Sequence, residues 1–107
     1  MMNPEIRDLW VDALNSGEYT QGYGALRKDD NFCCLGVLSD LAVKAGVIDE
    51  PVLIDSGDYQ YDGQSGFLSP RVAEWAGLNR SPIRLINMND GKHNKFKTIA
   101  KYIKENL

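Results

Sequence analysis

The amino-acid sequence predicts an α+β fold: a single domain over residues 1–107, with about four helices around a small, mostly antiparallel sheet. Three observations lead to this prediction. The chain length suits one domain, and 43% hydrophobic with 25% charged residues is an ordinary globular composition. Several segments carry apolar residues at helical spacing. Short β-type segments bounded by turn residues lie between them.

The first helix is predicted to begin after Asn3, whose side chain can cap it, with Pro4 at the first helical position. Its apolar face contains Ile6, Leu9, Trp10, Ala13 and Leu14. Gly17 is suited to the left-handed conformation that ends many helices. The next stretch, residues 18–24, is rich in tyrosine and glycine and is predicted to form an ordered loop.

A short hairpin is predicted over residues 25–34, with its turn at 29–31, and its second arm leads directly into a helix. The apolar face of this helix contains Cys34, Val37, Leu38, Leu41 and Ala45. Gly46 is the predicted stop. Gly36 lies in the first turns of this helix, where a glycine lowers the stability of the helix by about 1 kcal/mol relative to alanine. It therefore indicates the close approach of another backbone or of a ligand.

Residues 47–68 have the weakest pattern, with two short strands predicted at 52–54 and 59–61 and a turn at Asp62-Gly63. A short third helix is predicted from Ser69-Pro70 to Gly77. Its apolar residues are Val72, Ala73, Trp75 and Ala76.

The C-terminal third is predicted to contain one strand and one helix. Residues 82–88 alternate in polarity, which favours a strand, and the turn residues 89–91 end it. Asn94 is expected to cap a final helix. The predicted buried stripe of this helix contains Phe96, Ile99, Ala100 and Ile103.

No stretch of the sequence approaches the roughly 20 apolar residues that span a bilayer, so no membrane partner is expected. Acidic residues interrupt the apolar pattern of residues 1–14, where a secretory signal would need a continuous apolar run. The adjacent cysteines, Cys33 and Cys34, have no other cysteine as a partner and fit a reducing compartment. We therefore expect a cytoplasmic protein.

Charge is distributed unevenly along the chain. Residues 1–70 contain twelve acidic and four basic residues, whereas residues 71–107 contain three acidic and eight basic residues. The two halves could attract each other in the fold, or the C-terminal part could meet an anionic partner. Nucleic acid is not expected as a partner, because the chain is acidic overall and shows no nucleic-acid-binding motif.

Few residues indicate catalysis. Cys34 lies at a predicted helix N-terminus, where exposed amides can activate a thiol, but its apolar neighbours favour a buried structural cysteine. His93 has no partner at metal-ligand spacing, and Asp90 belongs first of all to a turn. The sequence shows no phosphate-binding glycine loop of standard spacing. No metal and no cofactor is predicted.

A set of polar and aromatic residues favours ligand binding. Tyr19, Gln21 and Tyr23 lie in a non-periodic stretch, and Arg27 could hold a phosphate or carboxylate through two hydrogen bonds. Trp10 falls on an apolar helix face and is most simply a core residue. The predicted ligand site is Trp10, Tyr19, Gln21, Arg27, Cys34, Asn89 and Asp90.

Most of the chain resembles a family of unknown function from tailed phages and prophages. The resemblance is carried by AL at 13–14, SGEYTQ at 16–21, GALR at 24–27, FCCLGVL at 32–38, WAGL at 75–78 and MND at 88–90. It continues in the ending, at Phe96, Ile99-Ala100, Tyr102-Ile103 and Asn106-Leu107. More distantly, the chain is similar to an actinobacterial family with a Gln-Gly, Cys-x-x-Gly-x-Leu and Asn-Asp skeleton. The phage pattern often has a further cysteine where this chain has Ser39, which argues against a three-thiol metal site.

The resemblance implies a phage-type accessory protein in a bacterial host. With the polar and aromatic set, it leads us to expect a protein that sequesters a small polar ligand without converting it. A nucleotide-derived signal of host defence is one candidate ligand. Two alternatives stay open: an inhibitor that binds a host enzyme through the acidic surface of residues 1–70, and a small enzyme that uses Cys34 or Asp90. Assembly into a homo-oligomer is also open.

Overall fold

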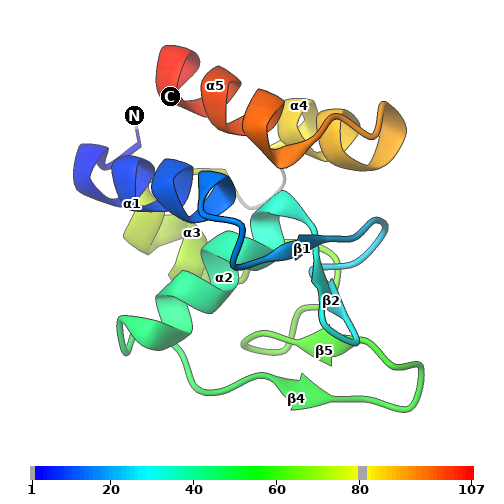
Figure 1. The fold of residues 1–107 in the computed structure, drawn as a ribbon. Helices are drawn as coiled ribbons and strands as arrows, with labels where there is room; N and C mark the ends of the chain where they lie inside the picture. Colours follow the sequence, from blue (N-terminus) through cyan, green and yellow to red (C-terminus); the bar gives the residue numbers. More distant parts are fainter. Residues whose placement is uncertain (1, 80–81) are drawn as a thin grey trace.

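The computed structural model describes residues 2–79 and 82–107, and this part of the chain contains five α-helices, a π-helical turn and two small sheets (Figure 1). The helical elements are α1 (Pro4–Asn15), α2 (Cys34–Lys44), α3 (Pro70–Ala76), α4 (Ile83–Ile86), the π-helical turn η1 (Asn87–Gly91) and α5 (Phe96–Asn106). The strands are β1 (Thr20–Gln21), β2 (Arg27–Lys28), β3 (Asn31–Phe32), β4 (Val52–Leu53) and β5 (Tyr59–Gln60). The predicted α+β class is confirmed, with five α-helices in place of about four.

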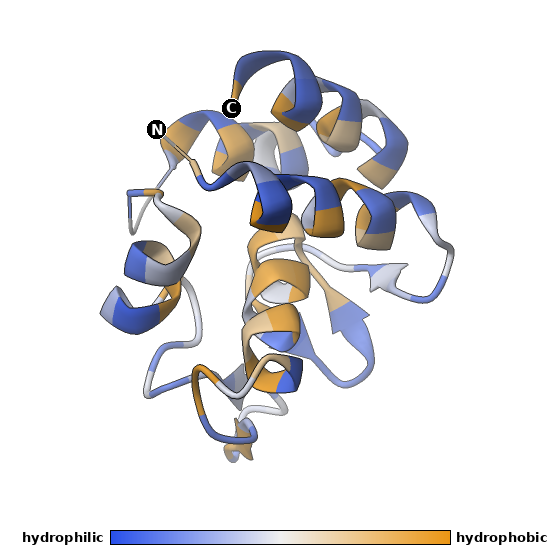
Figure 2. Cartoon of the chain, turned by 90° about the vertical axis from the view of Figure 1, so that its left-hand side faces the viewer, coloured by the Kyte–Doolittle hydropathy of each residue, from blue (hydrophilic) through white to orange (hydrophobic). Residues whose placement is uncertain are grey.

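Helix α2 lies at the centre of the molecule and contacts α1, α3, α4 and β3. It is buried on most of its circumference, and its middle is among the most hydrophobic parts of the ribbon (Figure 2). A Cβ at Gly36 would overlap the backbone carbonyl oxygen of Leu26, the residue before β2. Of the two predicted reasons for this glycine, the structure therefore shows the close approach of another backbone.

Helices α1 and α5 pack side by side above α2, which brings the two chain termini close together (Figure 1). The predicted cap of α1 is confirmed, since Asn3 Oδ1 accepts hydrogen bonds from the amides of Glu5 at 2.9 Å and Ile6 at 3.2 Å. The core between these helices contains Trp10 and Ile103, both fully buried. The amphipathic pattern of both helices thus places their apolar faces toward one shared core.

The strands are short and form two sheets. In the first, β3 pairs with β1 in parallel and with β2 in antiparallel register; in the second, β4 and β5 are antiparallel. An isolated antiparallel bridge between Lys28 and Asp58 connects the two sheets. The hairpin of β2 and β3 and the strands near 52–54 and 59–61 are confirmed. The predicted loop over 18–24 is wrong at Thr20–Gln21, because these two residues pair with β3.

The strand predicted over residues 82–88 is wrong. The described part of this segment forms α4 and the start of η1. Leu85 and Asn89 are buried and Met88 packs against the core, which is helical spacing, whereas Ile83 is 62% exposed. A short apolar run is compatible with both the two-residue period of a strand and the 3.6-residue period of a helix. Here the packing against the core stabilises the helix.

The cap predicted for the last helix is also wrong. Lys95 occupies the N-cap position of α5, and its side chain makes no capping hydrogen bond. The amide of Phe96 instead donates to Gln21 Oε1 at 3.2 Å, so the acceptor comes from β1, 75 residues earlier in the chain.

Among the helices in the described part of the chain, none is both long enough and apolar enough to cross a bilayer.

Candidate functional site

Gln21, Asn89 and Asp90, three of the residues predicted from sequence, form one hydrogen-bonded network in the structure. Gln21 comes from β1, and the other two are consecutive residues of η1. Asn89 is 1% exposed and uses both ends of its amide. Its Nδ2 donates to Gly22 O at 3.0 Å and to Asp90 Oδ1 at 2.7 Å. Its Oδ1 accepts from Gln21 Nε2 at 3.0 Å and from the amide of Cys34 at 3.3 Å.

The network satisfies amides at the starts of two helices. Asn89 Oδ1 accepts from the first residue of α2, and Gln21 Oε1 accepts from the first residue of α5. Gln21 Nε2 also donates to Asn94 O at 2.7 Å, and Asp90 Oδ1 accepts from the Gly24 amide at 3.0 Å. These acceptors supply partners that helix N-termini lack within the helix itself. The network therefore fixes β1 and the loop after it against η1, α2 and α5.

Trp10 and Cys34, also predicted as site residues, lie behind this network in the core. Both are fully buried, and Trp10 Nε1 donates to Cys34 O at 2.9 Å. Burial raises the pKa of the Cys34 thiol well above its usual range and that of Cys33 to about 11. Both thiols are therefore protonated at neutral pH and shielded from solvent, as the structural alternative for Cys34 predicts.

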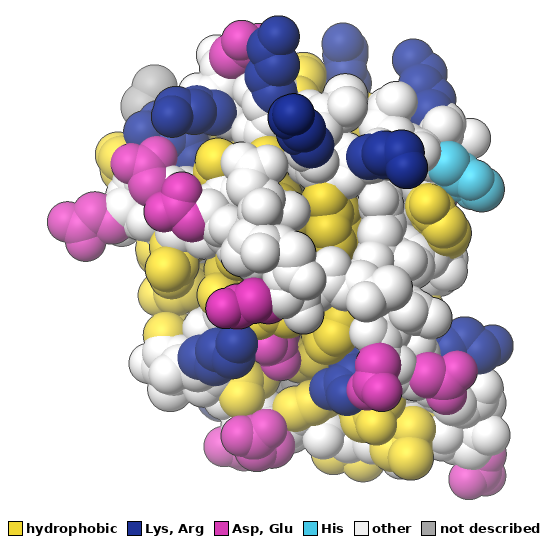
Figure 3. All heavy atoms as spheres, in the orientation of Figure 1, with side chains coloured by type: hydrophobic (Ala, Val, Ile, Leu, Met, Phe, Trp, Pro, Cys, Tyr) yellow, Lys and Arg dark blue, Asp and Glu magenta, His cyan; other side chains and the backbone are white. Residues whose placement is uncertain are grey.

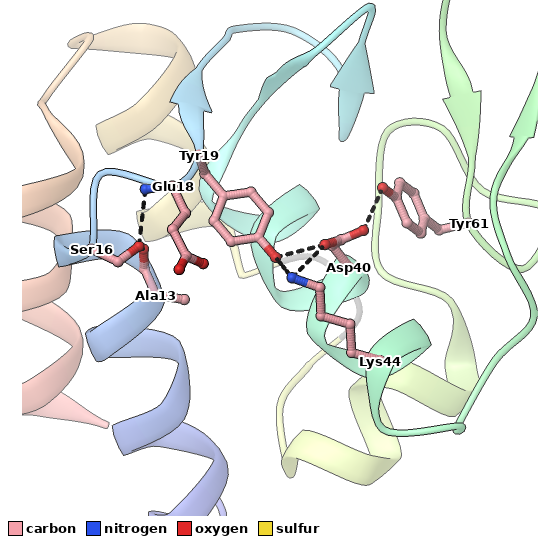
Figure 4. Close-up of polar contacts among 7 residues, drawn as sticks. All are labelled: Ala13, Ser16, Glu18, Tyr19, Asp40, Lys44 and Tyr61. Atoms are coloured by element: carbon pink, nitrogen blue, oxygen red, sulfur yellow. Dashed lines mark hydrogen bonds and ion pairs between the residues drawn. The ribbon is translucent and has the colours of Figure 1, made fainter.

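Tyr19, the sixth predicted residue, belongs to a second cluster on the outer side of α2. In Figure 4, the Asp40 carboxylate lies between two tyrosines, with Lys44 beside it. Tyr19 Oη donates to Asp40 Oδ2 at 2.6 Å, and Tyr61 Oη donates to Oδ1 at 3.3 Å. Lys44 Nζ donates to Tyr19 Oη at 3.0 Å and lies 3.6 Å from Asp40 Oδ2. The cluster connects α2 to β1 on one side and to the β4–β5 hairpin on the other.

Arg27 lies in the same region, because its guanidinium and the Tyr19 ring both contact Phe32. The guanidinium carbon lies 3.9 Å from the centroid of the Tyr59 ring. Its Nε donates to Asp29 O at 2.8 Å, and its Nη2 donates to Asp30 Oδ1 at 3.0 Å. Tyr19 and Arg27 are thus engaged with protein partners and form a different cluster from that of Gln21 and Asn89.

A solvent-open pocket of about 280 Å³ lies beside Gln21, which is the one predicted site residue among its lining residues. The pocket is formed by the loop after β1 and by the β2–β3 hairpin. Its lining residues are Gln21, Gly22, Tyr23, Ala25, Lys28, Asp29 and Asn31. Tyr23 is 48% exposed and stacks on His93, with ring centroids 4.1 Å apart and an interplanar angle of 25°.

Two of the residues at this pocket have an unusual backbone. Asp29, in its lining, has a φ of 53°, and His93, which supports Tyr23, has a φ of 52°. Side chains other than glycine seldom adopt this left-handed conformation, and such residues concentrate at binding and catalytic sites. Asp29 is held there by a hydrogen bond from its amide to Gly57 O at 3.2 Å.

A larger groove, of about 560 Å³, lies between α1 and α5, on the lysine-rich upper part of the molecule in Figure 3. Its lining residues are Val11, Asp12, Asn15, Lys97, Ala100, Lys101 and Lys104. None of the seven predicted site residues is among them. Its three lysines could bind an anion. A binding experiment therefore has to distinguish a ligand in this groove from a ligand in the pocket beside Gln21.

Within the described ranges, no group of three or more His, Cys, Asp or Glu side chains is arranged to hold a metal ion. In the same ranges, every buried side-chain nitrogen or oxygen has a hydrogen-bond partner. The Gln21–Asn89–Asp90 network is therefore complete without a ligand, and it borders the neighbouring pocket through Gln21 alone.

The predicted ligand site omitted Tyr23, Lys28, Asn31 and Asp40, although Tyr23 was considered together with Tyr19 and Gln21. The position of Tyr23 held a usable signal, because it follows Gln21 by two residues in the same non-periodic stretch. Lys28 and Asn31 are exposed residues of a hairpin, and nothing in the sequence shows that the loop after β1 faces them. Asp40 carries no local signal, since both tyrosines that contact it are 21 residues away in the sequence.

Comparison with known families places the whole described fold in one family. A family described as "Domain of unknown function (DUF8296)" matches residues 2–107, and the chain belongs to that family. The search of curated proteins and the search of solved structures gave no match.

Proposed function

We propose that this DUF8296 protein is a phage-type accessory protein that binds a small polar ligand in the pocket beside Gln21 and sequesters it without converting it. The observation that carries the proposal is the pocket itself, of about 280 Å³, whose lining residue Gln21 is held by a complete internal network. The phage assignment is supported by the sequence resemblance of the CCLGVL, WAGL and MND segments.

Three of the lining residues, Tyr23, Lys28 and Asn31, suit a ligand with a planar part and one anionic group, which has to lie on the Lys28 side of the pocket, away from the Asp29 carboxylate. The exposed ring of Tyr23 can stack on a base, and the Lys28 ammonium can pair with a phosphate. The amide of Asn31 can donate and accept hydrogen bonds at a base edge. A mononucleotide, or a signal derived from one, combines these features, and it agrees with the host-defence ligand expected from the sequence.

Pre-organisation supports tight binding at this pocket. Tyr23 stacks on His93, and the Gly24 amide is bonded to Asp90, so the loop after β1 is positioned before a ligand arrives. A binding site that is already ordered loses less conformational entropy on binding. The buried thiols of Cys33 and Cys34 are not among the lining residues, which supports binding over thiol chemistry.

Isothermal titration calorimetry with AMP, GMP, cyclic AMP and cyclic GMP tests the proposal. We expect at least one nucleotide to bind, and we expect Tyr23→Ala and Lys28→Gln each to weaken binding about tenfold, roughly the loss of one stacking or charge-assisted contact. Both side chains are exposed, so the thermal unfolding midpoint should stay close to that of the unmodified protein.

Lys101→Gln, in the groove between α1 and α5, is the matched control and should leave the affinity unchanged. Affinity that is lost in Lys101→Gln and kept in the other two variants would place the ligand in the larger groove and contradict the site. Absence of binding by every nucleotide would contradict the proposed ligand class.

A further inference from the structure

The β4–β5 hairpin carries a pair of adjacent exposed apolar side chains. Val52 is 61% exposed and Leu53 is 58% exposed. Within the described part of the chain, β4 pairs with β5 alone and is therefore an edge strand, at the lower margin of the molecule in Figure 1. Exposed apolar side chains on an edge strand promote association with another chain, and proteins normally avoid them.

The outer edge of β4 also presents main-chain groups. The Ile54 amide donates to Asp58 O at 2.9 Å, toward β5. Because successive residues of an antiparallel strand direct their amides to opposite sides, the N–H and C=O of Leu53 face the outer edge. Pro51, just before the strand, has no amide hydrogen and limits how far such pairing can extend. The edge thus offers a short and defined docking point.

The segment that forms this edge contains acidic residues and no basic ones, while Lys28 of β2 lies on the β5 side, beside the turn at Gly57. The sequence from 45 to 70 contains five acidic residues and no lysine or arginine. The acidic residues are Asp49, Glu50, Asp55, Asp58 and Asp62. The ion pairs found among the described residues are Arg7–Asp8, Arg27–Asp30 and Lys44–Asp40, so none of these five takes part in them. The negative electrostatic potential of these five carboxylates therefore extends into the solvent near Val52 and Leu53.

The hairpin is fastened to the rest of the molecule, so this surface exists before any partner arrives. Tyr61 is fully buried and donates to Asp40, and the Tyr59 ring lies against the Arg27 guanidinium. The Leu26 amide donates to Ser65 O at 2.8 Å. A fixed surface requires little ordering on association.

We infer that the outer edge of the β4–β5 hairpin, formed by Val52 and Leu53 and flanked by acidic residues, is a docking surface for a partner protein. The partner presents an extended segment in which basic residues alternate with apolar ones. Its apolar side chains cover Val52 and Leu53, and its cations face the acidic residues. Neither Val52 nor Leu53 lines the pocket beside Gln21, so one chain can hold a ligand and a partner protein at the same time.

Fluorescence polarisation with a labelled peptide of alternating lysine and valine tests this inference, with a glutamate–valine peptide of the same length as the comparison. The lysine–valine peptide should bind, and its affinity should fall with added salt, whereas the glutamate–valine peptide should not bind. The double variant Val52→Ser/Leu53→Ser should weaken binding of the lysine–valine peptide at least tenfold, although its charge is unchanged.

The matched control is Ile83→Ser, which removes an exposed apolar side chain elsewhere and should not change the binding. If the double variant and the unmodified protein bind the peptide equally well, general charge attraction explains the binding. That result would overturn the inference that Val52 and Leu53 form a docking surface. Sedimentation velocity is measured in parallel. Self-association that disappears in the double variant would assign the edge to a second copy of this chain and would likewise overturn the inference.

Discussion

Asn89 connects more parts of the molecule than any other polar side chain described above. Its amide contacts β1, the loop after β1, the start of α2 and its neighbour Asp90, and all four hydrogen bonds lie at 3.3 Å or less. Because the side chain is 1% exposed, water cannot replace these partners. Asn89 therefore helps to hold Gln21 and Gly22, two of the lining residues of the pocket, in position.

Replacement of Asn89 by alanine should lower the free energy of unfolding by about 2–4 kcal/mol, because it leaves buried donors and acceptors without partners. Urea unfolding followed by circular dichroism measures this loss. Asn87→Ala is the matched control, since Asn87 is an exposed residue of the same π-helical turn, and we expect a change within about 0.5 kcal/mol. Equal stability of the two variants would contradict a structural role for the network.

The buried thiols predict how stability responds to alkaline pH. In the folded state Cys33 keeps its proton up to a pKa of about 11, whereas its ordinary value is 9.0. Between these pH values the unfolded chain binds fewer protons than the folded one, so stability should be constant below about pH 9 and fall as the pH rises toward 11. Burial also raises the pKa of Cys34 and of Tyr61, which acts in the same direction.

Unfolding free energies measured across this pH range should show a loss of about 2 kcal/mol attributable to Cys33. In the variant Cys33→Ala the decline should be shallower, because one of the groups with a raised pKa is gone. An identical decline in the variant and in the unmodified protein would show that the Cys33 thiol does not remain protonated in the folded state.

Among the elements, α2 determines how the rest of the chain is arranged. It carries the Asp40 cluster on its outer face, receives the Asn89 network at its N-terminus, and lies directly against the backbone of Leu26 through Gly36. The Leu26 carbonyl also accepts the Cys33 amide at 3.1 Å. Close contact between this helix and the β2–β3 hairpin is what sets the shape of the pocket beside Gln21.

Gly36→Ala should therefore destabilise the protein by about 2 kcal/mol or more. Alanine favours a helix by about 1 kcal/mol, but the overlap with the Leu26 carbonyl oxygen has to be relieved by separating the helix from the hairpin. Gly91→Ala is the matched control, because a Cβ at Gly91 would meet nothing within 4 Å. Thermal unfolding of both variants decides the matter; a stabilised Gly36→Ala would show that the helix and hairpin can separate without cost.

The elements with a strong local signal could be predicted from the sequence, and those that depend on tertiary contacts could not. The apolar periods of α1, α2, α3 and α5 identified all four helices, and the capping residues Asn3 and Ser69 also marked the starts of α1 and α3. The α4–η1 segment carries a short apolar run without a decisive period. Strand β1 has two residues and exists only through its pairing with β3. The cap of α5 comes from Gln21, and no local signal records so distant a partner.

The candidate site shows the same limit. Gln21, Asn89 and Asp90 were selected as polar residues in non-periodic segments, and they do come together. Their hydrogen bonds to one another, 68 residues apart for Gln21 and Asn89, connect them into a network that borders a pocket through Gln21. The other lining residues, such as Lys28 and Asn31, are exposed and belong to no periodic sequence pattern. Only the folded structure shows that they line the pocket.

At the scale of the whole molecule, the lysine-rich helix α5 and the acid-only segment from 45 to 70 lie toward opposite ends, although each end also carries side chains of the other sign. The lysines of α5 lie at the top of the molecule in Figure 3, whereas the acid-only segment from 45 to 70 contains the β4–β5 hairpin near the bottom. The pocket beside Gln21 lies between the two ends, on the sheet that joins them. This arrangement allows ligand capture and partner docking to use different parts of one small surface.

Native mass spectrometry of the protein purified gently from phage-infected bacteria tests the central claim most directly. We predict a small non-covalent adduct that is lost on denaturation and is absent from the double variant Tyr23→Ala/Lys28→Gln prepared in the same way. The same adduct on both proteins would contradict the pocket beside Gln21 as its site. A bare chain that stays bare after addition of the four nucleotides in large excess would contradict sequestration of a nucleotide-type ligand.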